Sequence, residues 1–250
     1  MYKCIICNED SFIINHQANI ENLAILNIMK CKNCGLEYFY PIPNSNDIDK
    51  FYSTYVDGLA REDIVEKNSI RNIESLQMWG LTKKSRLLDF GCGKNIFVKT
   101  GQTENWKGYD KYSAVSLFSS YHCQKWDFIT MWGVLANLIT PKDTLQDLSN
   151  CLDFGGKLVL TDITIEAKIP CRRKYEHITY WTKKAIEILF DSVGLDIVEY
   201  RPYMEMQDSD VYLSRVMQTV PDDIRNKIFH KLPKYIEVPT NQVFVVGIKR

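Results

Sequence analysis

The stretch Leu87-Leu88-Asp89-Phe90-Gly91-Cys92-Gly93-Lys94-Asn95 is the part of the sequence that best indicates the fold. It reads as an apolar strand that ends in an acidic residue and a glycine-rich turn. In a doubly wound α/β sheet the turn after the first strand is where a ligand meets the backbone, and glycines there allow a close approach. A dinucleotide site would need a third glycine at position 96, where Ile96 stands, so NAD and FAD are disfavoured.

Downstream of this loop, short apolar runs alternate with helical stretches. The runs suit buried strands and cover residues 86–90, 107–109, 127–132, 157–163, 196–200 and 243–248. The clearest helices are predicted over residues 142–152 and 182–193, with Gly194 as the stop signal of the second. This alternation predicts an open α/β sheet with helices on both faces.

Two carboxylates mark the ends of the first two predicted strands. Asp89 closes the first strand, where a carboxylate can meet an ammonium group through water or backbone. Asp110 closes the second strand, 21 positions later, where a carboxylate can bind both hydroxyls of a ribose. A ligand with an amino acid end and a ribose fits both positions.

At these residues the sequence resembles the class I S-adenosylmethionine-dependent methyltransferases, over residues 81–250. The likeness rests on residues 88–93, 108–110, 126–135 and 155–160, which follow one another in the family's order. It implies a Rossmann-like doubly wound sheet with an antiparallel last strand, and S-adenosylmethionine as the cofactor. The cofactor contacts that it implies come from Asp89, Gly91, Cys92, Gly93, Asp110, Lys111, Met131, Trp132 and Tyr55.

Three features depart from the family's pattern. Asn95 replaces the small residue that commonly follows the loop. Only 16 residues separate Asp110 from Asp127, which leaves hardly any room for a third strand and for the acid that often contacts adenine. Ala136-Asn137 stands where the family often has Glu-His after the fourth strand.

The N-terminal cysteines predict a metal site. Cys4 and Cys7 form one C-x-x-C pair, Cys31 and Cys34 form a second, and 23 residues lie between the pairs. Two such pairs complete a tetrahedral shell, and four thiolates leave no position for water, so we expect a structural Zn²⁺. A redox or cluster role is the alternative. The span can hold a hairpin made of residues 11–14 and 25–29.

The sequence divides into three predicted parts. Residues 1–45 form a zinc-ribbon domain, residues 46–80 a helical linker or cap, and residues 81–250 the S-adenosylmethionine-binding domain. In the linker, the apolar positions Ile48, Phe51, Tyr52 and Tyr55 recur at helical spacing. The ribbon and the Phe51–Tyr55 segment are similar to the front half of bacterial methyltransferases that act on sugars and surface polysaccharide precursors.

A hydroxyl acceptor must lose a proton, and a histidine is the natural base. His177 follows the fifth strand, and the resemblance to sugar methyltransferases implies catalytic roles for Glu176, His177 and Tyr175. The alternative is that His177 caps the next helix or packs over the site.

Substrate contacts are predicted beside this base and in the linker. Arg172 and Arg173 could hold a phosphate or nucleotide of the acceptor, or form a solvated loop. Tyr52 is assigned to the substrate and Tyr55 to the cofactor, with plain packing as the alternative for both.

Composition limits the partners. Among 250 residues, 31 Lys and Arg balance 31 Asp and Glu, which argues against nucleic-acid binding by overall charge. No apolar run approaches the ~18 residues that cross a bilayer, so a cytoplasmic protein without a membrane partner is expected, its oligomeric state open.

Together these observations predict an S-adenosylmethionine-dependent methyltransferase that O-methylates a small anionic carbohydrate-type metabolite, such as a nucleotide sugar, a sugar phosphate or a polysaccharide precursor. A sugar C-methyltransferase and an RNA methyltransferase are the alternatives among enzymes. A cofactor-binding module without turnover is the alternative outside enzymes.

Overall fold

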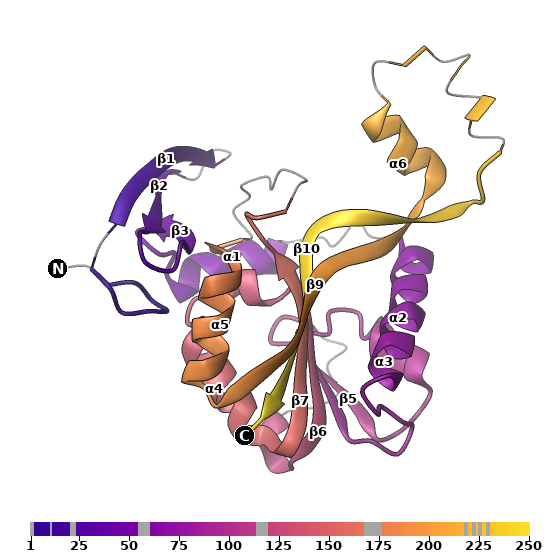
Figure 1. Cartoon of the computed structure of the whole chain (residues 1–250), viewed down its shortest axis with the longest axis horizontal. Helices are drawn as coiled ribbons and strands as arrows, with labels where there is room; N and C mark the ends of the chain where they lie inside the picture. Colours follow the sequence, from indigo (N-terminus) through magenta and orange to yellow (C-terminus); the bar gives the residue numbers. More distant parts are fainter. Residues whose placement is uncertain are drawn as a thin grey trace.

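The computed structural model describes residues 3–10, 12–20, 24–54, 61–113, 120–167, 177–217, 220–221, 224, 227–228 and 231–250. Its main sheet has six strands in the order β5-β4-β6-β7-β10-β9 (Figure 1). They are β4 (Leu87–Phe90), β5 (Trp106–Tyr109), β6 (Trp126–Trp132), β7 (Leu152–Ile163), β9 (Leu195–Asp208) and β10 (Tyr235–Lys249). The first four are parallel, whereas β10 runs antiparallel to both β7 and β9. The predicted fold class and all six predicted strands are confirmed.

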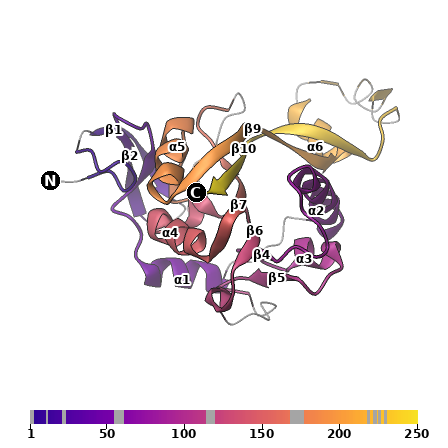
Figure 2. The same cartoon turned by 60° about the horizontal axis from the view of Figure 1, so that its bottom comes forward.

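Helices cover both faces of this sheet. α4 (Pro141–Cys151) and α5 (Lys183–Ser192) lie on one face, and α2 (Glu62–Gln77) and α3 (Ile96–Gly101) lie on the other (Figure 2). Consecutive strand residues alternate between the two sides, so Leu87 packs with the α2 and α3 cluster and Leu88 with the larger cluster on the α4 and α5 side. Both faces are buried, which explains why the strands read as continuous apolar runs.

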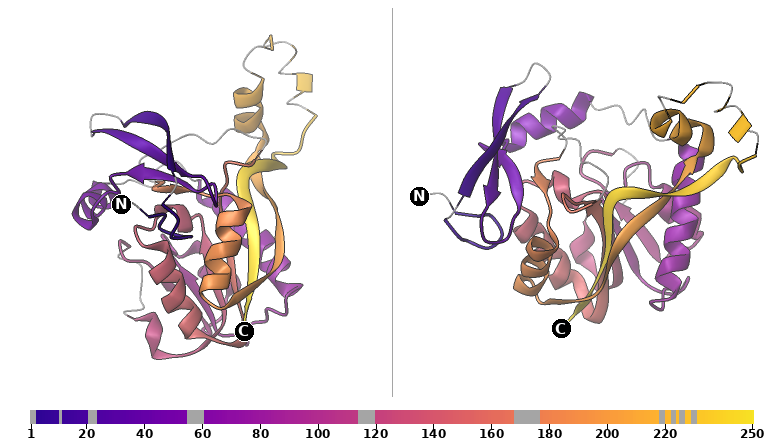
Figure 3. Two further views of the ribbon diagram at one scale, coloured as in Figure 1. Left: turned by 60° about the vertical axis from the view of Figure 1, so that its left-hand side comes forward. Right: turned by 45° about the horizontal axis from the view of Figure 1, so that its top comes forward.

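A second sheet contains the N-terminal residues. β1 (Phe12–Ile20) and β2 (Ala24–Cys31) form the expected antiparallel hairpin, with strands longer than predicted. β3 (Glu37–Tyr40) pairs with β2 on one side and with β8 (Thr179–Tyr180) on the other. The N-terminal sheet thus takes its fourth strand from the residues after β7, and it lies beside α5 (Figure 3).

The connection from β5 to β6 is short. Its described part holds η1 (Tyr121–Cys123), a single 3₁₀ turn, and within the described residues β5 is the edge of the sheet. This agrees with the expectation that hardly any room exists for a third strand there.

Two further elements complete the fold. α1 (Ser45–Thr54) is the helix that the spacing of Ile48, Phe51 and Tyr52 predicts. β9 and β10 continue past the sheet as a paired arch, which carries α6 (Ser209–Val216) at its far end (Figure 1). Within the described residues, no helix is both long and apolar enough to span a membrane.

Candidate functional site

The glycine loop after β4 has the backbone conformation that its sequence requires. Gly91 has φ +77° and Gly93 has φ +50°, in the left-handed region that favours glycine. A Cβ atom on Gly91 would stand 2.5 Å from Cγ2 of Val134, so this position has no room for a side chain. The amides of Gly91 and Cys92 both donate to the carbonyl oxygen of Tyr109, at 2.7 and 3.2 Å, which fixes the loop over the end of β5.

Asp110 follows β5 and is held by backbone amides. Its Oδ2 accepts from the Gly93 amide at 2.9 Å, and its Oδ1 accepts from the amides of Tyr112 and Ser113 at 2.8 and 3.1 Å. These bonds orient the carboxylate beside the glycine loop.

Asp89 lies below the loop near the end of β4 and is only 2% exposed. The Thr130 hydroxyl donates to its Oδ1 at 2.8 Å. Burial, with a smaller effect of the nearby Asp110 charge, raises the pKa of Asp89 to about 7. Burial likewise raises the pKa of the Cys92 thiol to about 12, so this cysteine is a neutral thiol near pH 7.

Two adjoining cavities, of about 300 and 950 Å³, open above these residues. They share the lining residues Gly91, Gly93, Lys94, Trp132 and Gly133, and so form one cleft along the carboxyl ends of the parallel strands. Open α/β sheets bind ligands at this edge.

The larger cavity has an aromatic wall. The rings of Phe90 and Tyr109 stack with centroids 5.5 Å apart, and the Tyr121 ring meets the Tyr109 ring edge-on at 4.9 Å. Across the cavity, the ring of Tyr52 from α1 stacks on Tyr112 at 4.6 Å. Such flat apolar surfaces suit a heteroaromatic ring.

The cleft brings together most of the residues predicted for cofactor and substrate. Those that line it are Asp89, Gly91, Cys92, Gly93, Asp110, Lys111, Trp132 and Tyr52. Met131 instead is fully buried in the core on the α4 and α5 side and lines neither cavity, because its side chain points away from that of Trp132. Tyr55, Arg172, Arg173, Tyr175 and Glu176 lie outside the described residues.

His177 is not one of the residues that line the cleft. It is half-buried, and its ring meets the Tyr180 ring edge-on at a centroid distance of 6.3 Å. The amide of the next residue, Ile178, donates to the carbonyl oxygen of Ala136 at 2.7 Å. Ala136 belongs to η2 (Leu135–Asn137), and Asn137 of the same turn lines the larger cavity.

The smaller cavity also contains residues that sequence reasoning missed. They are polar residues of α2, β9 and β10, namely Asn68, Ser69, Asn72, Tyr203, Glu205 and Gln242. Asn68 and Asn72 stand four residues apart, and this spacing on one helix face was the only signal of them in the sequence.

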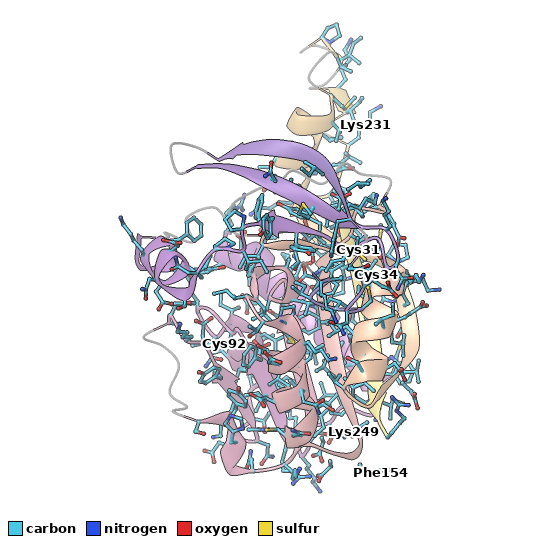
Figure 4. All side chains as sticks on the ribbon, turned by 90° about the vertical axis from the view of Figure 1, so that its left-hand side faces the viewer. Cys31, Cys34, Cys92, Phe154, Lys231 and Lys249 are labelled. Atoms are coloured by element: carbon cyan, nitrogen blue, oxygen red, sulfur yellow. The ribbon has the colours of Figure 1, made fainter. Side chains whose placement is uncertain are left out.

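The four N-terminal cysteines converge as predicted. Their sulfur atoms all lie within 4.8 Å of one another, and all four are free thiols. Sγ of Cys4 is 3.7 Å from Sγ of Cys34, and Sγ of Cys7 is 3.5 Å from Sγ of Cys31. A tetrahedral zinc site with ~2.3 Å bonds has sulfur–sulfur edges of ~3.8 Å, so the donor set fits zinc. Figure 4 shows Cys31 and Cys34 close together and away from Cys92, so the cysteine cluster and the cleft are separate.

Comparison with known protein families gives one match. The model of the methyltransferase domain family matches residues 63–200, more than half of the chain. No curated protein sequence gives a significant match.

Solved structures share the fold. An S-adenosylmethionine-dependent methyltransferase of Thermotoga maritima is 13% identical with a TM-score of 0.52, and the match covers 81% of this chain and 98% of that one. A complex between a Haloferax volcanii methyltransferase activator and a candidate methyltransferase gives 14% identity and a TM-score of 0.52, over 81% of this chain and 97% of the other. The chain belongs to the methyltransferase domain family and is an S-adenosylmethionine-dependent methyltransferase.

Proposed function

We propose that the protein methylates a small carbohydrate-type acceptor, at oxygen, in the cleft above the main sheet. The observation that carries this proposal is the pair Asp89 and Asp110, which stand at the ends of neighbouring parallel strands beneath one continuous cleft. A ligand with an ammonium end and a ribose matches this pair, and the wall of Phe90, Tyr109 and Tyr121 suits its adenine.

The chain's own residues would hold S-adenosylmethionine by three kinds of contact. Asp110 would accept hydrogen bonds from the ribose, the amides of the glycine loop would approach the amino acid end, and the tyrosines would cover the base. When bound, the cofactor supplies an electrophilic methyl group. The protein's part is to bring the acceptor close and to exclude water, and α2 and the β9–β10 arch close the smaller cavity for that purpose.

Proton removal from the acceptor hydroxyl is proposed for His177, with Glu176 or Tyr175 in support. The link from Ile178 to Ala136 supports this role, because it places His177 next to the η2 turn that forms part of the cleft. Arg172 and Arg173 precede His177 by a few residues, and we propose that they bind an anionic group of the acceptor.

We also propose a structural Zn²⁺ at Cys4, Cys7, Cys31 and Cys34. Support comes from the sulfur distances, which match a tetrahedral site, and from the fact that all four candidate ligands are cysteine sulfurs.

Calorimetry with S-adenosylmethionine and S-adenosylhomocysteine tests the assignment of the cleft. Asp110→Asn should weaken binding of both by about tenfold to a hundredfold, because it removes charge-assisted hydrogen bonds to the ribose. Asp143→Asn, in the exposed first turn of α4, is the matched control and should leave affinity unchanged. Equal affinity of wild type and Asp110→Asn for both ligands would show that Asp110 does not bind the ribose.

A further inference from the structure

One end of the cleft extends beyond the residues assigned to the cofactor. Asp110, Asp89 and Trp132 stand at the ends of β5, β4 and β6, which are the first three strands in the sheet order. The smaller cavity continues past Trp132 over the next strands, to Thr161 in β7 and Gln242 in β10. A cofactor laid along the first three strands leaves this end free for the acceptor.

The wall of this end is the arch of β9 and β10. Gln242 of β10 pairs with Ile163, the last residue of β7. The part of β10 before Gln242 pairs with β9, for example Val238 with Glu205, and extends past the end of β7. Glu205 lines the cavity from this raised part of the arch.

α2 forms the opposite wall and is fixed to the arch by polar contacts. The Asn68 carboxamide donates to the Met206 carbonyl oxygen at 3.1 Å and accepts from the Met206 amide at 2.7 Å. The Tyr203 hydroxyl donates to Oδ1 of Asn72 at 3.0 Å. The two walls thus hold their side chains in place before any acceptor arrives, which lowers the entropy lost on binding.

The charges around the cavity indicate what it can take. Lys94 is the one cation among its described lining residues, and its ammonium group already pairs with Glu62 at 3.2 Å. The carboxylates of Asp89 and Glu205 both line the cavity. A phosphate or carboxylate group of an acceptor would be disfavoured here, because Lys94 is the single positive charge among the described lining residues and is already paired.

The remaining groups suit hydroxyls. Glu205, whose Oε1 accepts from the Gln207 carboxamide, keeps further lone pairs on its carboxylate for an acceptor hydroxyl. Gln242 offers a carboxamide, and Nε1 of Trp132 is buried without a hydrogen-bond partner in the described structure. The rings of Trp132 and Phe97, 5.2 Å apart, add an apolar surface for C–H groups. A sugar ring has both hydroxyls and apolar C–H faces.

We propose that this end of the cleft is the acceptor site, that it takes an uncharged, hydroxyl-rich ring, and that Glu205 and Gln242 determine its specificity. The inference rests on the proposed function and adds to it where each part of the acceptor binds. The uncharged ring lies between α2 and the arch, and any anionic group of the acceptor lies outside this cavity.

Ligand-observed saturation-transfer NMR on the full chain loaded with S-adenosylhomocysteine tests the proposal. The probes are the methyl glycosides of glucose, galactose, mannose and rhamnose, with glucose 6-phosphate and spermidine as charged comparisons. We expect at least one methyl glycoside to bind. Glu205→Gln should weaken that binding by about tenfold or more while affinity for S-adenosylhomocysteine stays within twofold. Glu74→Gln, an exposed carboxylate on α2 outside the cavity lining, is the matched control and should bind like wild type.

Several results would overturn the proposal: no methyl glycoside binds, only spermidine or only glucose 6-phosphate binds, or Glu205→Gln binds the glycosides as well as wild type. A loss of S-adenosylhomocysteine affinity in Glu205→Gln would instead assign Glu205 to the cofactor, and it too contradicts the proposal. Wild-type protein that fails to bind S-adenosylhomocysteine contradicts the proposed function itself, so the two failures are distinguishable.

Discussion

At the scale of single residues, Asp89 links the cofactor cleft to the stability of the fold. An unfolded aspartate loses its proton near pH 3.8, whereas burial raises the pKa of Asp89 to about 7. Between these values the folded state binds more protons than the unfolded state, so the free energy of unfolding decreases as the pH rises from 4 to 7. Asp162, buried at the end of β7, has its pKa raised to about 7 for the same reason and contributes in the same direction.

Asp89→Asn should therefore make the ligand-free protein less sensitive to pH. The decrease in unfolding free energy between pH 4.5 and pH 8 should shrink by about 3 kcal/mol, while the contribution of Asp162 remains. Urea denaturation at the two pH values measures it. The Asn side chain can still accept from Thr130, so the hydrogen bond at 2.8 Å is kept. An unchanged pH dependence would mean that Asp89 is already ionised at low pH.

The proposed base is a second residue-scale prediction. His177→Ala should lower methyl transfer to a glycoside acceptor by ~10²–10⁴-fold, the usual contribution of general base catalysis, and leave affinity for S-adenosylhomocysteine unchanged. His122→Ala is the control, since Nδ1 of His122 contacts Sγ of Cys151 at 3.5 Å and is remote from His177. A loss of less than threefold in His177→Ala would remove this histidine from the mechanism.

At the scale of elements, β8 joins the N-terminal sheet to the cleft. Its pairing with β3 is followed by Thr182, whose hydroxyl donates to the carbonyl oxygen of Cys34 at 2.5 Å and accepts from the Ala185 amide at 3.1 Å. One hydroxyl therefore caps α5 and satisfies a buried carbonyl in the cysteine cluster. Ile178, Thr179, Tyr180 and Trp181 are all fully buried, so this segment has no freedom to move independently of either sheet.

Thr182→Val should destabilise the protein by about 2 kcal/mol, because it removes a helix cap and leaves the Cys34 carbonyl without a partner. The free energy of unfolding in urea measures the effect. Thr182→Ser keeps the hydroxyl and should lose much less. An equal loss in Thr182→Ser would show that the methyl group, which only this variant removes, contributes as much to stability as the hydroxyl does, and no loss in Thr182→Val would contradict the role of the hydrogen bonds.

The elements also show what a sequence can and cannot predict. The strands of the main sheet were predictable because burial on both faces makes their apolar runs continuous. The glycine loop and Asp110 were predictable because backbone conformation and strand ends restrict residue type locally. β8 was not, since a two-residue strand leaves no periodic pattern and is defined by its partner Glu37–Tyr40. The walls of the smaller cavity were not, because Asn68, Tyr203 and Gln242 come from three distant segments that only tertiary pairing brings together.

At the scale of the whole molecule, the buried residues form two hydrophobic clusters, and the cysteines belong to only one of them. Cys4, Cys31 and Cys34 belong to the large cluster that also contains most of the buried apolar residues of β6 and β7. The second cluster, between the sheet and α2 and α3, contains no residue of the N-terminal sheet. The helices α2 and α3 therefore pack against a part of the core that is separate from the cysteines, whereas Leu88 and Phe90 of β4 pack with the cluster that contains them.

Removal of the proposed zinc ion should therefore lower the local stability of the N-terminal sheet and of β8 more than that of β4 and β6. After treatment with a strong zinc chelator, amide hydrogen exchange should accelerate by at least tenfold in β2, β3 and β8, because the four clustered thiols, three of them buried, then lack the ion that joins their chain segments. Exchange in β4 and β6 should change little, and S-adenosylhomocysteine should still bind. Cys31→Ser should reproduce the pattern, whereas Cys92→Ser, in the glycine loop, should leave exchange in β8 as in wild type. Loss of protection across β6 and β7 as well would show that the two halves unfold as one unit, and unchanged protection of β8 would separate the metal site from the cleft altogether.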